Sequence, residues 1–449
     1  MKAIILAAGQ GKRMHSKLQK VLHPILGKPI VQYAVEAARE AGVNDITVVV
    51  GQDGEDIKNE MKELTLNFAV QEQPLGTGHA VQSAISQVQD TDDVMILCGD
   101  MPLVTSEFLS EMIDFYRASS SDAVVAAVYR PDAQDFGRVY DKNGNFIEIV
   151  ESKDMKPESP KTDWANTGIY LFKGDALRSG LSRLKNNNSQ QEYYLTDVPK
   201  LLKEDNRPVR VFHTYEDIST FTGINTQIQL AEATAHMRKR INNQHMSQGV
   251  RMIDPATVFI DSTVKLSPGV VLYPGVILEG KCEAEENAVI GPNSHLTDTI
   301  VSANAKVRQS VTSGAKIGES TEVGPFAYLR PGTVIGKSCR VGNFVEIKNA
   351  TLGDKTKMAH LAYIGDADVG SGVNYSCGAI TANYDGKNKH RTIIGNNAFI
   401  GSNANLVAPV EVGENAMVAA GSTITDNIPV DSLGIARQRQ TVKLNWRKK

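Results

Sequence analysis

The second half of the chain carries an aliphatic residue at every sixth position, commonly followed by glycine. The spacing holds through three runs, Val258 to Val276, Ile317 to Ile347 and Ile394 to Ile424. A period of six matches neither an amphipathic helix, which repeats near 3.6 residues, nor a plain alternating strand. It predicts a solenoid in which each hexad is a short strand plus a turn, and three hexads close one triangular coil. The alternative, a β-sandwich, would give irregular loop lengths instead of a fixed register.

The corners of such a coil require residues that tolerate positive φ. Glycine adopts positive φ without strain and asparagine at little cost. Asn304, Asn343, Asn397 and Asn415 fall between repeats and are therefore the expected corner residues.

The first half alternates apolar runs with helical segments. The pattern predicts strands at residues 3–8, 46–50 and 94–97 and a helix at 30–41. This alternation is typical of an α/β domain, in which a parallel sheet has helices on both faces. Such sheets bind ligands in the crevice outside the carboxyl ends of their strands.

A loop with two glycines, Gly9 and Gly11, follows the first apolar run. Absent side chains there let backbone N–H groups approach an anion. Leu6, Arg13 and Met14 stand where the Walker motif and the dinucleotide fingerprint require other residues, so neither motif is present. The basic residues just beyond the turn suit a triphosphate but also fit a solvated basic face; they are Lys12, Arg13, Lys17 and Lys20.

Polar residues mark other strand and helix ends. Asp100 follows the third strand, where a carboxylate suits Mg²⁺ or, alternatively, a simple turn before proline. Thr77 is the expected N-cap of a helix running through Val88, whose free N–H groups can meet an acceptor. Asn166 and Asn225 add uncharged amides, which can recognise sugar hydroxyls.

Composition narrows the classes of partner. The 449 residues carry a formal net charge of −3, so no global basic field recruits nucleic acid. No apolar run approaches a membrane span and the N-terminal KAIILAAG is too short for a signal peptide, so we expect a cytoplasmic protein without membrane insertion. The four cysteines lack CxxC spacing, which indicates reduced thiols.

A connector joins the two halves. Residues 228–248 have helical composition, sparse apolar positions and a following Gly249 suited to a C-cap. We therefore predict a domain at 1–227, a helical linker at 228–248 and a second domain at 249–449. The last residues of that domain form a cationic tail that caps the open end of the solenoid.

Breaks in the repeat indicate where to look for function. The hexads slip by one position between Ile347 and Leu352. From about Val373 to Thr392 a polar, glycine-rich stretch interrupts them and predicts a protruding loop. Such a loop is either a binding element on a rigid scaffold or a tolerated insertion.

His360 lies on the repeat shortly before this interruption. Imidazole has a pKa near neutrality and can act as a general base, although a lone histidine is more often a surface residue without a role. The nearby cations Arg330 and Lys348 can hold a sugar phosphate.

Ordered motifs give the chain a family resemblance. The hexads resemble those of hexapeptide-repeat acyltransferases, which build a left-handed parallel β-helix. The first half carries LAAGxGxRM, QKVLH, QxxPLGTGHA, CGDMPL, FGRV, IVESKD, NTGIY, EYYLTD and GIN in the order found in sugar-1-phosphate uridylyltransferases. Over nearly its whole length the chain resembles bifunctional bacterial N-acetylglucosamine-1-phosphate uridylyltransferases / glucosamine-1-phosphate N-acetyltransferases. The implied fold is a Rossmann-like nucleotidyltransferase domain, a helical linker and a C-terminal left-handed β-helix.

For the first half, the resemblance implies Mg²⁺-dependent attack of N-acetylglucosamine 1-phosphate on the α-phosphorus of UTP. The metal ligands would be Asp100 and Asn225. The implied contacts to UTP or UDP-N-acetylglucosamine are Leu6, Ala7, Ala8, Gly9, Arg13, Lys20, Gln71, Gly76, Thr77, Gly137, Glu151, Asn166 and Asn225.

For the second half, the resemblance implies that His360 accepts a proton from the amino group of glucosamine 1-phosphate, which then attacks the thioester of acetyl-CoA. Arg330, Lys348, Tyr363 and Asn374 would bind the amino sugar phosphate. The implied acetyl-CoA contacts are Cys377, Asn383, Tyr384, Ser402, Ala420 and Arg437. The family also implies a homotrimer with the acetyl site between subunits, and a product that feeds peptidoglycan.

The chain departs from the family pattern at three positions. Lys12 stands where the family mostly has Thr, Gln19 where Pro often precedes the lysine, and Phe136 where Tyr is common. Two other functions stay open at this point. One is a nucleotidyltransferase whose β-helix is only an oligomerisation stalk, and the other is a scaffold without enzymatic activity.

Overall fold

The computed structural model describes residues 1–132, 135–156 and 159–448. The chain divides into two compact units, Met1–Met237 and Arg238–Lys449. The long helix α7 (Gln227–Ser247) contributes its first half to one unit and its second half to the other. Among the described residues, no helix combines the length and apolarity that crossing a bilayer requires.

The first unit is built on a nine-stranded sheet in the order β5-β4-β1-β6-β10-β7-β11-β9-β8. The predicted strands at 46–50 and 94–97 are confirmed as parts of β4 and β6, and both pair in parallel with β1. The strands are β1 (Lys2–Leu6), β4 (Asp45–Gly51), β5 (Asn67–Gln71), β6 (Asp93–Cys98), β7 (Ala123–Tyr129), β8 (Arg138–Lys142), β9 (Asn145–Val150), β10 (Trp164–Lys173) and β11 (Val209–Thr214).

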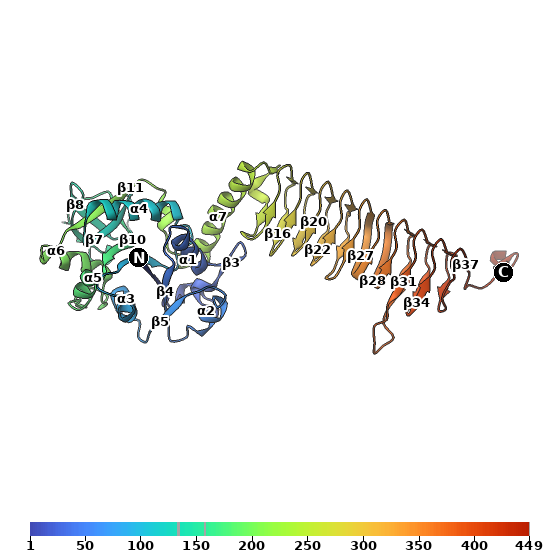
Figure 1. Ribbon diagram of the computed structural model, residues 1–449, viewed down its shortest axis with the longest axis horizontal. Helices are drawn as coiled ribbons and strands as arrows, with labels where there is room; N and C mark the ends of the chain where they lie inside the picture. Colours follow the sequence, from blue (N-terminus) through green and yellow to red (C-terminus); the bar gives the residue numbers. More distant parts are fainter. Residues whose placement is uncertain (133–134, 157–158, 449) are drawn as a thin grey trace. The chain divides into compact units, whose positions relative to one another are not determined.

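Helices cover both faces of this sheet, as the alternating pattern predicts (Figure 1). Successive residues of β1 face opposite layers: Ala3 and Ile5 pack with one core and Ile4 with the other. The first core contains residues of α1 (Ile30–Glu40) and α4 (Ser106–Ser119). The second contains residues of α3 (Thr77–Ala84), α5 (Gly174–Leu181) and α6 (Val198–Glu204), while the short α2 (Glu55–Glu60) follows β4.

The second unit is a parallel β-helix of 26 strands, from β12 (Arg251–Met252) to β37 (Leu433–Gly434), most of them two or three residues long. Figure 1 shows its coils stacked one behind another. Each strand pairs in parallel with the equivalent strand of the next coil, as Val271 does with Val289. The aliphatic hexad residues lie inside, where Ile317, Val323 and Leu329 are buried. The solenoid predicted from the period of six is confirmed.

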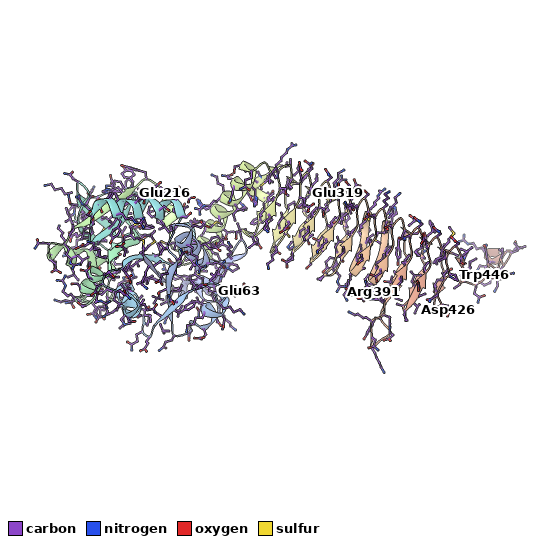
Figure 2. All side chains as sticks on the ribbon, in the orientation of Figure 1. Glu63, Glu216, Glu319, Arg391, Asp426 and Trp446 are labelled. Atoms are coloured by element: carbon purple, nitrogen blue, oxygen red, sulfur yellow. The ribbon has the colours of Figure 1, made fainter. Side chains whose placement is uncertain are left out.

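Two expectations about the coils need correction. Positive φ at Asn304, Asn397 and Asn415 confirms them as corner residues, but at the fourth site the corner falls on Phe344, one residue beyond Asn343. The interruption is also shorter than predicted. The strands β29 (Asn374–Tyr375) and β30 (Ile380–Ala382) still pair within the stack, so only residues 383–391 leave it before β31 (Thr392–Ile394). Arg391 marks the base of this projecting loop in Figure 2.

Candidate active sites

The loop after β1 packs closely against the segment that carries Lys20. Gly11 has a φ of 61°, and a Cβ at this position would lie 2.7 Å from Cβ of Lys20. Glycine is therefore required both for the backbone conformation and for the close approach. The approach places the buried Lys20 side chain beneath the loop, facing the end of β6.

Lys20 joins the two residues expected to hold the metal. Its ammonium donates to Oδ2 of Asp100 at 2.5 Å and to Oδ1 of Asn225 at 3.1 Å. The backbone N–H of Ile224 also donates to the carbonyl of Asp100 at 2.9 Å, which fixes the two segments side by side. One cation therefore already contacts both oxygens, so this pair fits Mg²⁺, which takes one or two protein oxygens plus water and phosphate. No cluster of three or more acidic, His or Cys ligands occurs in the described residues.

Two adjoining cavities lie beside the phosphate loop. One, of about 240 Å³, is lined by Leu6 to Gly9 together with Lys20 and Asp100. The other, of about 380 Å³, shares Ala7 to Gly9 and extends to the turn after β4. Both lie at the carboxyl ends of parallel strands, where the fold class predicts a ligand.

Gln71, Gly76 and Thr77 meet at one end of the smaller cavity. The Gln71 amide donates to the carbonyl of Gly76 at 3.1 Å. The prediction that Thr77 caps α3 is wrong: Gly76 is the residue before the helix, and the Thr77 hydroxyl instead accepts from the N–H of Leu195 at 3.1 Å. The predicted helix through Val88 ends at Ala84 and continues as one 3₁₀ turn.

Gly137, Glu151 and Asn166 also come together. The N–H of Asn166 donates to the carbonyl of Gly137 at 2.8 Å, and a Cβ on Gly137 would lie 3.3 Å from Oε2 of Glu151. Burial raises the pKa of the Glu151 carboxyl, although the Thr196 hydroxyl opposes the rise by donating to it at 3.0 Å. The three residues thus form one polar group, in which Gly137 packs closely against the Glu151 carboxylate.

Some residues of this site differ from the sequence expectation. Arg13 is exposed and is not among the residues that line either cavity. Cys98 lines the smaller cavity, but burial raises its pKa to about 12, so the thiol is protonated and unsuited to nucleophilic attack. Lys12 and Gln19, which the sequence analysis singled out as departures from the family pattern, line the larger cavity. Sequence reasoning missed the turn after β4, although the strand-end rule pointed to it. The lining residues that it did not name are Gln10, Val21, Gly51, Gln52, Asp53, Glu72, Pro74, Ala80 and Glu192.

In the β-helix, His360 lies at a corner within β28 (Lys357–Val369) and is exposed. Its Nδ1 is 3.0 Å from Oδ1 of Asn343 on the preceding coil, in β27 (Arg340–Leu352). Because an amide oxygen only accepts, this contact assigns the proton to Nδ1 and leaves the lone pair of Nε2 free. A free Nε2 is what a general base requires.

Cations gather at the next corner of the same coils. The side chains of Lys348 and Lys389 contact each other, and this contact, with burial a smaller cause, lowers the pKa of Lys348. Arg330 lies on the coil before and pairs with Glu346 at 2.9 Å. Two adjacent ammonium groups favour an anion between them. Lys389 belongs to the projecting loop, and the sequence analysis did not include it in the site.

One flat face connects these two corners. Tyr328, Glu346, Tyr363 and Ile380 occupy equivalent outward positions on successive coils of this face. His360 is at the corner before the face, and Lys348 is at the corner after it. The face therefore presents a base at one side and a phosphate-binding group at the other.

The residues expected to contact acetyl-CoA divide between the two corners. Cys377, Ser402 and Ala420 follow one another along the His360 corner, since Asn403 donates to the Cys377 carbonyl at 2.9 Å and Gly421 to that of Ser402 at 2.8 Å. The Arg437 side chain lies beside Gly421 at the same corner. Asn383 and Tyr384 instead begin the loop at the Lys348 corner, so a single chain does not bring all six together. Asn374 lies on the face that precedes the His360 corner.

Comparisons with known proteins agree with both units. Residues 3–168 match the MobA-like NTP transferase domain, and residues 314–349 and 391–426 match the bacterial transferase hexapeptide (six repeats). Bifunctional protein GlmU from Acetivibrio thermocellus is 46% identical over 99% of this chain and 96% of its own length. The GlmU proteins of Exiguobacterium sibiricum and Clostridioides difficile are 45% and 42% identical over 99% of this chain, and over 99% and 97% of their own lengths.

Fold and sites together define a two-domain transferase, with a nucleotidyltransferase unit and a hexapeptide-repeat unit in one chain. The chain belongs to the family of bifunctional GlmU proteins.

Proposed function

We propose that this chain makes UDP-N-acetylglucosamine, a precursor of peptidoglycan, in two steps in the cytoplasm. Residues 249–449 transfer an acetyl group from acetyl-CoA to glucosamine 1-phosphate. Residues 1–227 then join the product to UTP and release pyrophosphate, and residues 228–248 link the two domains. The observation that carries the proposal is the presence of both machineries in one chain: Lys20 between Asp100 and Asn225, and His360 across one face from Lys348.

In acetyl transfer, the phosphate of the amino sugar binds Lys348, Lys389 and Arg330, which directs the amine toward His360. Nε2 of His360 accepts a proton from the amine as its nitrogen attacks the thioester carbonyl. The carbon–nitrogen bond forms, the carbon–sulfur bond breaks and coenzyme A leaves. Asn343 holds the imidazole in the required tautomer throughout.

In uridylyl transfer, a phosphate oxygen of N-acetylglucosamine 1-phosphate attacks the α-phosphorus of UTP in line with departing pyrophosphate. Lys20 and the N–H groups of the phosphate loop hold the nucleotide and neutralise its charge. Asp100 and Asn225 would hold Mg²⁺, which supplies further charge neutralisation at the phosphates when bound. Gly137, Glu151 and Asn166 orient the amino sugar.

The test is a reconstitution with the full chain. Glucosamine 1-phosphate, acetyl-CoA, UTP and Mg²⁺ are supplied together and with each omitted, and the products are identified by mass. We expect UDP-N-acetylglucosamine only from the complete mixture, and N-acetylglucosamine 1-phosphate when UTP is omitted. Uridylylation of added N-acetylglucosamine 1-phosphate without any acetylation would instead favour the stalk hypothesis, and neither product would favour a scaffold.

We further propose that the chain works as a homotrimer, with the His360 corner as the contact between subunits. Phe326, Phe344 and Leu361 follow one another on this corner, are exposed by more than half and have positive φ. The two phenylalanine rings stack at 5.6 Å. Positive φ costs bulky residues about 1 to 2 kcal/mol, and side chains that stay more than half exposed offset little of that cost in an isolated chain. A partner subunit that covers them accounts for both, and its projecting loop would bring Asn383 and Tyr384 to this corner.

Phe344→Asp should therefore yield a monomer with little acetyl transfer and nearly normal uridylyl transfer. Burying the aspartate carboxylate against a second subunit is costly when no opposite charge pairs with it. Sedimentation velocity measures the subunit number, and the two activities are assayed separately. Phe259→Asp, which changes an exposed phenylalanine on an early coil away from the His360 corner, is the matched control. A Phe344→Asp protein that remains a trimer would contradict this assignment of the interface.

A further inference from the structure

The larger cavity contains both residues at which this chain departs from the motifs around the phosphate loop. Lys12 and Gln19 line it together with Gly51, Gln52 and Asp53 from the turn after β4. The smaller cavity already holds Lys20 and Asp100. The larger one extends instead to the turn after β4, and β4 and β6 flank β1 on opposite sides.

The charges and donors along this cavity favour an anion. The ammonium of Lys12 has no hydrogen-bond or ion-pair partner within the described residues. In the same part of the chain, the backbone N–H groups of Gly9, Gln10 and Gly11 donate to no protein acceptor. Consecutive free N–H groups around a residue in the left-handed region form an anion-binding concavity, and Gly11 has a φ of 61°.

Carboxylates also line this cavity, so binding of an anion there depends on the positive charge of Lys12. Asp53 and Glu72 are exposed on its wall. Without Lys12, a phosphate entering the cavity would meet two negative side chains and only neutral donors. Lys12 thus decides whether the wall attracts or repels an anion.

Gln19 fastens the loop across the cavity. Its Nε2 donates a hydrogen bond to the backbone carbonyl of Asp53. Gln19 precedes Lys20 directly and has a φ of −59°, the value that a proline ring would impose. The hydrogen bond to Asp53 therefore holds the backbone turn at Gln19. In a protein with proline at this position, the ring itself would impose the same φ.

We propose that the larger cavity binds the two terminal phosphates of UTP, which leave as pyrophosphate, with Lys12 as their cation and Gln19 as the positioning residue. The proposal rests on the proposed uridylyl transfer. Lys12 contacts the part of the nucleotide that departs, so it strengthens binding of both UTP and pyrophosphate. Gln19 acts through the loop, because its amide N–H is already donated to the carbonyl of Asp53.

The first experiment compares Lys12→Met with Lys62→Met, an exposed lysine elsewhere in the unit, using the full chain. Lys12→Met should raise the KM for UTP and the inhibition constant of pyrophosphate by the same factor, roughly 3- to 10-fold, as expected for one charge-assisted contact. The KM for N-acetylglucosamine 1-phosphate should not change, and Lys62→Met should match the wild type. Unchanged constants in Lys12→Met, or equal effects of both variants, overturn the proposal.

The second experiment separates the two effects of Gln19. Gln19→Ala should raise the KM for UTP with little change in kcat, and Gln19→Pro should restore it, because proline imposes the same φ without the amide. An unchanged Gln19→Ala protein, or a Gln19→Pro protein no better than Gln19→Ala, overturns the positioning role. If the wild type itself releases no pyrophosphate, the proposed function fails; if only these variants behave as wild type, this inference alone fails.

Discussion

Acetyl transfer should fall at least about 100-fold in kcat when His360 is replaced by alanine, the usual loss on removing a general base. The Nε2 lone pair that accepts the proton of the amine disappears. The imidazole of His295 occupies an equivalent outward position on the same face, but it lies several coils away and pairs with Glu279. Uridylyl transfer should be unaffected, because its residues belong to the other unit. Coenzyme A release and pyrophosphate release, measured on the same preparation, distinguish the two activities.

Two further variants make this result specific. His295 is an exposed histidine on an earlier coil, paired with Glu279 at 2.8 Å, and His295→Ala should acetylate normally. Asn343→Ala should lose less activity than His360→Ala, because the imidazole remains but its tautomer is no longer fixed. Near-normal acetylation by His360→Ala would remove the base assignment, and the corner would then need another proton acceptor.

The fold could be predicted from the sequence because each half has a regular pattern. The first half alternates strand and helix segments, and the second half repeats every six residues. The hexads between Val258 and Ile424 dictate which residues point inward, and the coils follow them. The residues that occupy corners and helix caps were harder to predict. Phe344 takes a corner that Asn343 suits better, and Thr77 enters the helix instead of capping it. In both cases contacts with other segments override the preference of the residue itself.

The sites were predictable only where residue type and position coincided. Asp100 at a strand end and Lys20 after the phosphate loop meet as expected. Lys389 lies on a projecting loop, and no spacing rule indicates that the loop folds back toward Lys348. The turn after β4 enters the larger cavity through its position beside β1, which depends on strand order and not on any motif.

The two active sites make different demands on the chain. The nucleotide site is formed within one unit, where loops from several strand ends converge. The acetyl site uses a flat face of a solenoid, which has little depth of its own. In the proposed homotrimer a second subunit would supply the remaining wall, which is why we expect only acetylation to depend on Phe344.

Uridylyl transfer should fall roughly 100- to 1,000-fold when Asp100 is replaced by asparagine, a loss typical of removing a preorganised charge that stabilises the transition state. The amide keeps the shape of the side chain but offers no charge to Mg²⁺ or to Lys20. Acetyl transfer should remain normal. Asp45→Asn is the matched control, because Asp45 also pairs with a lysine, Lys2 at 2.6 Å, but at the amino end of β4, away from the strand ends that form the site.

Stability measurements separate catalysis from folding in the same variant. Asp100→Asn leaves the buried Lys20 ammonium without its carboxylate, which should lower the free energy of unfolding by about 1 to 3 kcal/mol. The double variant Lys20→Met/Asp100→Asn removes the unpaired charge and should regain most of that stability in urea titrations. It should stay inactive in uridylyl transfer, because both the metal ligand and the phosphate-binding cation are lost. Recovery of activity together with stability would mean that the pair serves the fold and not the reaction.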